Sequence, residues 1–272
     1  MPTDRHPPAV AEARIPLVST HTHTNLSLCG HAEMTFDAVV GTAARLGYEL
    51  LVLCDHVHVP TVTNYPRHLE RLAWYRQRRA ELQPPLPVVI GAEFEVTAAG
   101  CVVEPEPFVE AAECAIVAPN HYQLDWVVSP RGGPVEAAAH ELDHLETAIA
   151  WPHTDVVAHP FAATGITPSP DELYLACDQG RLRELLVQAV ERDVALEIQP
   201  KYWFIPERAG HLTELFETWL GLGGKVALGS DAHRLSGLQT WSEQYQEIAT
   251  RFGLDRQRLW WPASEKGNTW IG

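Results

Sequence analysis

The sequence predicts an α/β protein whose parallel strands close into one barrel. Three observations predict this fold class. Short apolar runs alternate with longer amphipathic stretches along most of the chain, and the short runs are apolar throughout rather than at every second residue. The length of 272 residues fits one barrel-sized domain as easily as two small ones. Because strands that are apolar on both faces are typical of parallel sheets covered by helices, the alternation favours a barrel.

Seven short runs have the composition of buried strands. They are apolar along their length, and most are followed by an amphipathic stretch, which is the strand-then-helix order of a parallel sheet. In chain order they are Ile15–Thr20, Leu50–Cys54, Val88–Ala92, Cys114–Ala118, Val156–Ala158, Val194–Ile198 and Lys225–Gly229.

The stretches between these runs have the pattern of helices with one buried face. The first ends at Gly47, and glycine is the usual residue just after a helix. No linker divides the chain, so we expect one domain over residues 15–272 after a tail at residues 1–14. The predicted helices are Thr35–Leu46, Arg67–Leu82, Val135–Ala150, Arg181–Arg192 and Leu212–Leu220.

The charge balance narrows the classes of partner. The chain has 20 Lys and Arg against 35 Asp and Glu, a net charge of −15, and 46% of its residues are hydrophobic. This charge repels phosphate backbones and anionic lipids, which disfavours a nucleic-acid binder with a broad basic surface and a protein of the membrane surface. No apolar run has the length of a signal peptide core or of a membrane span.

The five cysteines indicate a reducing compartment. Their number is odd and none forms a C-x-x-C pair, which argues against a disulfide framework and against a structural zinc knuckle. We therefore expect a soluble, cytoplasmic protein. The cysteines are Cys29, Cys54, Cys101, Cys114 and Cys177.

Histidines and acidic residues gather where the predicted strands end. The carboxyl ends of barrel strands share one mouth, so ligands far apart in the sequence would meet there. An H-x-H pair by itself is more often two ordinary polar residues than a metal site, but chance gives no reason for the recurrence at one strand after another. The residues are His21, His23, His56, His58, Glu93, His121, His159, Asp231 and His233.

Three segments that carry these residues indicate more than one metal ion. His21-Thr22-His23 places two imidazoles on one side of a strand, since alternate side chains share a face. Asp231-Ala232-His233 repeats that spacing with a carboxylate and an imidazole. Glu93 ends the third strand, and its two oxygens can bridge two ions. The pattern predicts a metal centre with a bridging carboxylate.

These residues lie in segments that resemble the motifs of the PHP family, the polymerase and histidinol phosphatase superfamily. The resemblance runs from Val18 to His233, and the opening motif looks like that of histidinol-phosphatase-like members. The segments are the block from His21 to His31 (HTHTNLSLCGH), Cys54-Asp55-His56, Gly91-Ala92-Glu93, Pro119-Asn120-His121, Ala158-His159-Pro160 and Gly229-Ser230-Asp231-Ala232-His233.

The resemblance implies a distorted, TIM-like (β/α) barrel of seven strands with three metal ions at its mouth. Nitrogen and oxygen donors suit Zn, Mn or Fe, and we expect two to three divalent ions. Cys29 is expected to pack near the ligands rather than to act as one. By the family's pattern one ion would take His21, His23, Glu93 and Asp231, a second His31, His56 and His233, and a third His121 and His159 with Glu93 bridging.

The resemblance also implies a metal-dependent phosphoesterase. The expected reaction is hydrolysis of a small phosphomonoester, similar to histidinol phosphate, by hydroxide that metal binding generates near neutral pH. Glu93, Asp231 and His233 are then the catalytic residues. The proton donor to the leaving group stays open among a metal-bound water, Asp55 and His58.

Three cations are candidate contacts for the substrate phosphate. Lys201 follows the sixth strand, where histidinol phosphatases of this type tend to carry an Arg, and it would bind phosphate as a point charge rather than as a bidentate fork. Arg131 lies in the loop Ser129–Pro134, and Arg234 follows His233.

Other functions remain open on the same scaffold. A nuclease or nucleotide phosphatase should offer a cationic groove, whereas Lys and Arg are scattered here through predicted helices. An amidohydrolase also opens with H-x-H at a strand end, but it would not need His31 or Glu93. A non-catalytic PHP module would tend to lose ligands, and every expected position is filled. The small phosphomonoester is favoured.

Overall fold

The computed structural model describes residues 15–103, 106–162, 164–199 and 206–263, and it confirms the α/β class. The predicted tail at residues 1–14 and Lys201 lie outside the described residues. The strands are β1 (Val18–Ser19), β2 (Leu50–Leu53), β3 (His56–Val57), β4 (Val88–Ile90), β5 (Ala92–Ala98), β6 (Cys101–Val102), β7 (Ala115–Ala118), β8 (Val156–Val157), β9 (Ala195–Ile198) and β10 (Val226–Leu228). The helices are α1 (Phe36–Leu46), α2 (Tyr65–Leu82), α3 (Glu106–Ala111), α4 (Pro134–Ala150), α5 (Pro170–Ala176), α6 (Gln179–Glu191), α8 (Pro206–Gly221) and α9 (Leu235–Arg251).

Within the described residues, these strands form a barrel with seven strand positions. β2 and β3 together occupy one position, and so do β4 and β5. Parallel pairs run from β1 to β2 and β4, and then from β5 through β7, β8 and β9 to β10. The ring closes between its ends, because Thr20 N donates to Leu228 O at 2.9 Å and Thr22 bridges Ala232. The predicted number of strands and their closure are confirmed.

The break between β4 and β5 has a steric cause. Gly91 separates the two strands, and a Cβ there would lie 2.6 Å from Cys114 Sγ and 3.0 Å from Cys114 O. Only glycine lets the chain between β4 and β5 lie this close to Cys114. Beyond Gly91, β5 pairs with β3 and β7, which brings Glu93 opposite His56.

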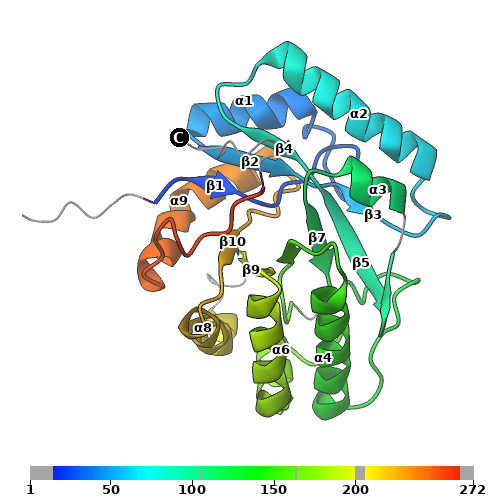
Figure 1. Cartoon of the computed structure of the whole chain (residues 1–272), viewed down its shortest axis with the longest axis vertical. Helices are drawn as coiled ribbons and strands as arrows, with labels where there is room; N and C mark the ends of the chain where they lie inside the picture. The colour runs from blue at the N-terminus through cyan, green and yellow to red at the C-terminus, as the bar shows by residue number, and fades with distance from the viewer. Residues whose placement is uncertain (1–14, 104–105, 163, 200–205, 264–272) are drawn as a thin grey trace, which may run out of the picture.

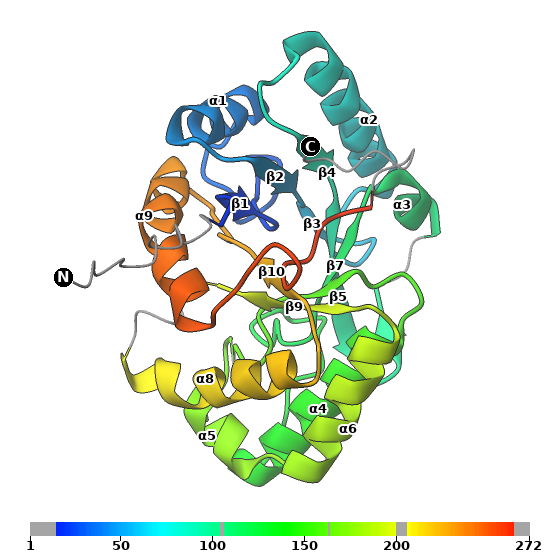
Figure 2. The same ribbon diagram turned by 60° about the vertical axis from the view of Figure 1, so that its left-hand side comes forward.

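Helices surround the barrel on all sides in view (Figure 2). Helix α1 has a clear signal at each end. The Thr35 side chain caps its start by accepting a hydrogen bond from Ala38 N at 3.3 Å, and Gly47 ends it with a φ of 81°. Each of these helices buries one face against the strands, as its apolar spacing predicts.

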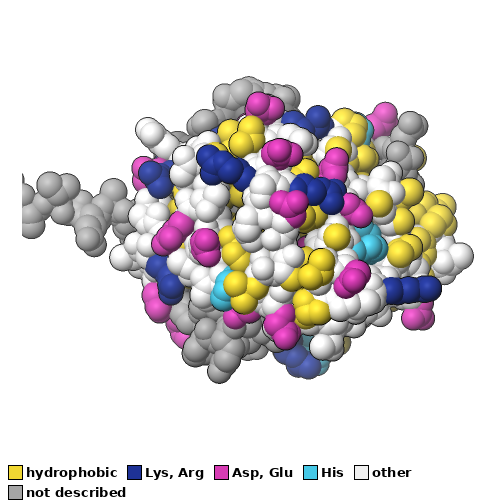
Figure 3. Space-filling model, turned by 90° about the horizontal axis from the view of Figure 1, so that it is seen from below, with side chains coloured by type: hydrophobic (Ala, Val, Ile, Leu, Met, Phe, Trp, Pro, Cys, Tyr) yellow, Lys and Arg dark blue, Asp and Glu magenta, His cyan; other side chains and the backbone are white. Residues whose placement is uncertain are grey.

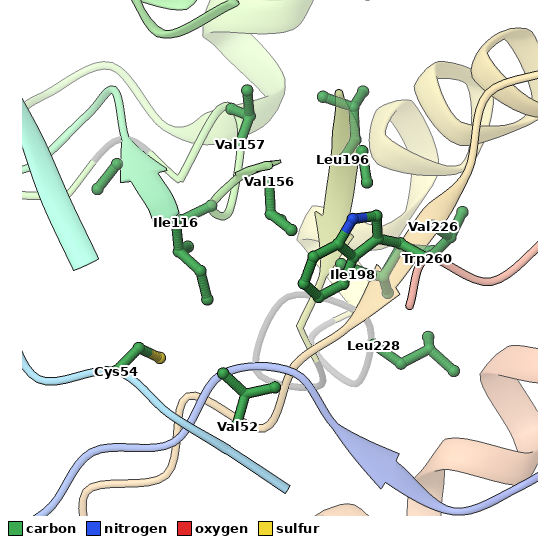
Figure 4. Packing of buried hydrophobic residues seen from close by; sticks show 14 of the residues in the cluster. Val52, Cys54, Ile116, Val156, Val157, Leu196, Ile198, Val226, Leu228 and Trp260 are labelled. Carbon is green, nitrogen blue, oxygen red and sulfur yellow. The ribbon is translucent and has the colours of Figure 1, made fainter. Parts of the chain in front are cut away.

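The barrel interior is a continuous apolar core. Figure 4 shows Val52 of β2, Ile116 of β7 and Val156 of β8 facing a shared space. Trp260 lies beside β10, where its backbone N–H donates to Val226 O at 2.8 Å. Each fully buried side chain of this size stabilises the fold by about 1.5–3 kcal/mol, so the polar mouth stands on a strongly stabilised base.

Several elements, the short helix α3 and the short strand β3 among them, were not expected from the sequence. β5 runs on to Ala98 and folds back on β6 as an antiparallel hairpin. The short helix α5 precedes α6. The long helix α9 covers β1, where Trp241 Nε1 donates to Val18 O at 2.6 Å. These elements and the predicted ones are seen together in Figure 1. Among the described residues, every helix is too short or too polar to cross a membrane.

Candidate metal centre

The structure brings together all the proposed ligands except His31. They come from the carboxyl ends of strands or from the residues just after them, as the barrel geometry requires. Two have strained backbones, with a φ of 45° at Asp231 and of 30° at His159, a feature that concentrates at functional sites. The assembled residues are His21, His23, His56, Glu93, His121, His159, Asp231 and His233.

Four side chains converge at the end of β1. His21 Nε2 lies 3.1 Å from His23 Nε2, 3.3 Å from Glu93 Oε2 and 3.7 Å from Asp231 Oδ1. His23 Nε2 lies 3.4 Å from Glu93 Oε2 and 3.1 Å from Asp231 Oδ1. Donors about 2.0–2.2 Å from a tetrahedral ion stand about 3.3–3.6 Å apart, so these spacings fit one divalent cation.

The two oxygens of Glu93 face different groups of histidines. Oε2 faces His21 and His23, and it also lies 2.9 Å from His56 Nδ1. Oε1 faces the other side, 3.3 Å from His159 Nε2 and 3.7 Å from His121 Nε2. This is the arrangement of a carboxylate that bridges two sites.

Several rings are held by one nitrogen so that the other faces the cluster. His21 Nδ1 lies 2.9 Å from Glu197 Oε1, His159 Nδ1 lies 3.0 Å from Asn120 Oδ1, and His121 Nδ1 lies 3.3 Å from Glu95 Oε1. An oxygen at Nδ1 fixes the N–H there and leaves the lone pair on Nε2. Metal-binding histidines have this pattern of support.

Some buried atoms of the cluster have no hydrogen-bond partner among the described residues. They include Glu93 Oε2, His56 Nδ1 and His23 Nδ1. The 2.9 Å approach of His56 Nδ1 to Glu93 Oε2 lacks the alignment of a hydrogen bond. Such atoms are costly unless something else satisfies them, and the donor set fits a divalent cation.

The electrostatics keep the carboxylate charged. Burial alone would raise the pKa of the Glu93 carboxyl, but the neighbouring His56 and His21 rings outweigh burial and hold this pKa well below its usual range. Burial lowers the pKa of His23 and His159, which favours neutral rings. Burial would also lower the pKa of His21 and His56, but nearby anionic groups, Glu93 among them, outweigh burial and raise both, so metal binding would displace protons from these two rings.

Glu197 supports the cluster from behind and was missed by the sequence reasoning. Its Oε1 accepts from His21 Nδ1, and its Oε2 accepts from His159 N at 3.0 Å and from Gln199 Nε2 at 2.8 Å. A Cβ at Gly229 would overlap Glu197 Oε1, so glycine is required there. A lone acid in the apolar strand β9 was the signal in the sequence.

Glu95 supports the opposite side. It lies two residues after Glu93 on the same face of β5, 2.7 Å from His58 Nδ1, and it accepts a hydrogen bond from Trp126 Nε1 at 2.8 Å. Burial would raise the pKa of Glu95, but the His121 and His58 rings outweigh it and lower this pKa to about 2.

Asp55 serves the fold of the loop after β1. Its Oδ1 accepts from Thr24 N, and its Oδ2 accepts from the Thr24 hydroxyl and from Tyr75 OH, each at 2.7 Å. With both oxygens occupied and only 4% of the residue exposed, Asp55 is disfavoured as a proton donor to a substrate.

His31 does not join His56 and His233, contrary to the expectation from the motif. Its side chain is 46% exposed, and Nδ1 lies 3.8 Å from Glu33 Oε1. Cys29 is also exposed, but its Sγ lies within 4.8 Å of a ring nitrogen of each of His23, His56 and His233. Burial would raise the pKa of the Cys29 thiol, but hydrogen bonding to His233 and His56 lowers it to about 5.

The candidate phosphate contacts lie at the edge of the site. Arg234 is exposed and follows His233 directly. Arg131 is exposed and lines a pocket of about 740 Å³ together with Trp126 and His140. Since Trp126 also binds Glu95, this pocket adjoins the cluster rather than containing it.

Comparisons with known proteins bear on the fold. No protein-family model and no curated protein matches the chain. A histidinol phosphate phosphatase from Lactococcus lactis subsp. lactis, solved with zinc, L-histidinol and phosphate, superposes with a TM-score of 0.69 at 17% identity, covering 89% of this chain and 95% of that one. A candidate histidinol phosphatase from Listeria monocytogenes gives 0.61 at 13% identity, covering 84% and 99%. The chain therefore has the α/β barrel fold of the Lactococcus lactis histidinol phosphate phosphatase.

Proposed function

We propose that this protein is a metal-dependent phosphoesterase of the PHP family that hydrolyses a small phosphomonoester. The observation that carries the proposal is Glu93, a buried carboxylate whose two oxygens face two separate groups of imidazoles. The barrel shared with a histidinol phosphate phosphatase supports it, since the cluster occupies the strand ends where barrel enzymes carry their active sites.

We assign two to three divalent ions to the cluster, chosen among Zn, Mn and Fe. Two of these sites would share Glu93, and Glu93, Asp231 and His233 are proposed as the catalytic residues. One ion would be held by His21, His23, Glu93 and Asp231, another by Glu93, His121 and His159, and a further one by His56 and His233.

Bound divalent ions supply Lewis acidity, a nucleophile from water near neutral pH, and positive charge that attracts phosphate to an acidic chain. The residues of the chain position that chemistry. Glu197 and Asn120 fix the rings of His21 and His159, so the cluster is held ready before a substrate arrives. Arg234 and Arg131 are proposed contacts for the substrate at the rim, and Lys201 stays a proposal at a position outside the described residues.

A small substrate is favoured over a nucleic acid by the surface. On the face seen in Figure 3, Lys and Arg lie singly among Asp and Glu rather than as a continuous basic patch. A nuclease that holds a phosphate backbone needs several adjacent cations. Histidinol phosphate is the first substrate to test, because the Lactococcus lactis structure holds L-histidinol and phosphate.

The proton donor is narrowed to two of the three candidates. Asp55 has both oxygens in hydrogen bonds, whereas His58 lies beside the cluster with its ring stacked on His56 at 4.8 Å. We propose His58, whose Nδ1 lies 2.7 Å from Glu95 Oε1, or a water molecule at the cluster, as the donor to the leaving oxygen.

The test is a panel of phosphomonoesters assayed with Zn, Mn and Fe each supplied, with nucleotides and single-stranded DNA included. We expect release of inorganic phosphate from a small phosphomonoester, and a loss of more than about 100-fold in kcat/KM for Glu93→Gln with the fold retained by circular dichroism. Cleavage of DNA without phosphomonoesterase activity would favour the nuclease, and unchanged turnover in Glu93→Gln would refute the assignment.

A further inference from the structure

We propose that Cys29, and not His31, completes the site of His56 and His233 as a sulfur ligand. The proposal rests on the proposed metal centre and changes its composition. Cys29 Sγ and one ring nitrogen each of His23, His56 and His233 all lie within 4.8 Å of one another. His23 already faces the first site through Nε2, which leaves Cys29, His56 and His233 around the other ion.

The turn that carries Cys29 is fixed in this position. Ser27 N donates to Thr24 O at 3.2 Å, and Gly30 N donates to Ser27 O at 3.1 Å. His31 N then donates to His233 O at 3.0 Å, which ties the turn to the segment after β10. A Cβ at Gly30 would overlap Thr24 O, so the turn closes only with glycine.

The side chains on either side of Gly30 have different neighbours. Cys29 is itself exposed, but its Sγ lies among ring nitrogens of the histidines. The His31 side chain, 46% exposed, lies instead beside Glu33, with Nδ1 3.8 Å from Glu33 Oε1. The sequence motif alone does not reveal this difference.

Unpaired nitrogens on two of the same rings give a second, independent observation. His56 Nδ1 and His23 Nδ1 have no hydrogen-bond partner among the described residues, and these side chains are 10% and 0% exposed. The rings pack directly on one another, with centroids 4.6 Å apart for His23 and His56 and 4.4 Å apart for His23 and His233.

His233 presents the correct nitrogen. Its Nδ1 lies 2.8 Å from Asp231 O, and since a carbonyl only accepts, Nδ1 carries the proton and Nε2 carries the lone pair. Binding of an ion by Cys29 breaks the S–H bond, releases the proton to water and leaves the electron pair on sulfur as the donor. A thiolate favours Zn or Fe over Mn at this site, whereas the oxygen-rich first site accepts all three.

The first experiment is X-ray absorption at the zinc edge of the zinc-loaded full chain. We expect a sulfur shell at about 2.3 Å in the wild type, in His31→Ala and in Cys101→Ser, and loss of that shell with loss of one ion in Cys29→Ser. Cys101 is the matched control, because it is the other described cysteine that is exposed.

The second measurement uses the wild type alone, so it does not depend on a variant that folds. Alkylation by iodoacetamide, followed by peptide mass spectrometry, should be slowed at Cys29 by zinc at least about tenfold and restored by a chelator, while Cys101 reacts alike in both states.

The outcomes separate this proposal from the proposed function. Two or more bound ions and phosphatase activity without a sulfur shell, or loss of an ion in His31→Ala and not in Cys29→Ser, would overturn the role of Cys29 alone. A wild type that binds no ion would overturn both proposals.

Discussion

At the scale of single residues, buried carboxylates that are not themselves proposed ligands support the candidate metal centre. Glu197 is 1% exposed and has each oxygen in a hydrogen bond from an N–H group. It fixes which nitrogen of His21 faces the other ligands. The orientation of a proposed ligand ring is thus set by a residue that is itself neither a proposed metal ligand nor a proposed substrate contact.

Glu197→Gln should weaken metal binding about 10–100-fold while the barrel stays folded. An amide offers one oxygen and one NH₂ group, so it cannot accept from both His21 Nδ1 and His159 N. The NH₂ group must therefore face an N–H donor. Zinc affinity by competition with a chelator measures the effect. The exposed Glu184→Gln on α6 is the control and should bind as the wild type does; equal affinity in the two variants would contradict the supporting role of Glu197.

Glu95 should make the metal-free protein sensitive to acid. Its pKa is about 2 in the folded chain against about 4.3 in an unfolded one, so its charge contributes stability that is present above pH 4.3. That stability is lost as the pH falls from 4.3 towards 2. Urea unfolding between pH 6 and pH 3 should show a shallower pH dependence in Glu95→Gln than in the wild type. An identical slope would contradict the ion pairing of Glu95 with His58 and His121.

At the scale of elements, strands were predictable and turns were not. The seven buried strands could be predicted from continuous apolar runs, since a strand covered on both faces has no polar side. The histidines after them were found because position in a strand fixes which face a residue takes. The turn that brings Cys29 Sγ to the histidines contains the close contact between Gly30 and Thr24, which spacing in the sequence does not encode. The hairpin of β5 and β6 was missed because its second strand is too short to give a pattern.

Two Gly→Ala changes should have opposite effects on stability, because Gly229 lies against Glu197 of β9 whereas Gly210 has free space around it. Gly229→Ala should destabilise the protein by about 1–3 kcal/mol, because the new Cβ overlaps Glu197 and lies 2.8 Å from His21 Cβ. Gly210→Ala, in helix α8 with no atom within 4 Å of its Cβ, should stabilise by up to about 1 kcal/mol. Urea denaturation of both variants checks this pair, and destabilisation of equal size in both would contradict the steric account.

At the scale of the whole molecule, an apolar barrel carries a polar mouth that holds the proposed metal centre. The core residues of the strands are fully buried, and the helices cover them on every side in view (Figure 2). The net charge of −15 is unsuited to a phosphate substrate unless cations are held at that mouth. The proposed phosphate binding would therefore require the proposed metal ions, and the proposed activity should depend on how many ions are present.

The most direct measurement of this central claim is a titration of the metal-free protein with zinc, in which bound zinc and phosphomonoester hydrolysis are followed together. The bridging position of Glu93 predicts that activity rises only after more than one equivalent of zinc has bound per chain. Full activity at one equivalent, or hydrolysis without any bound ion, would contradict a multinuclear metal centre.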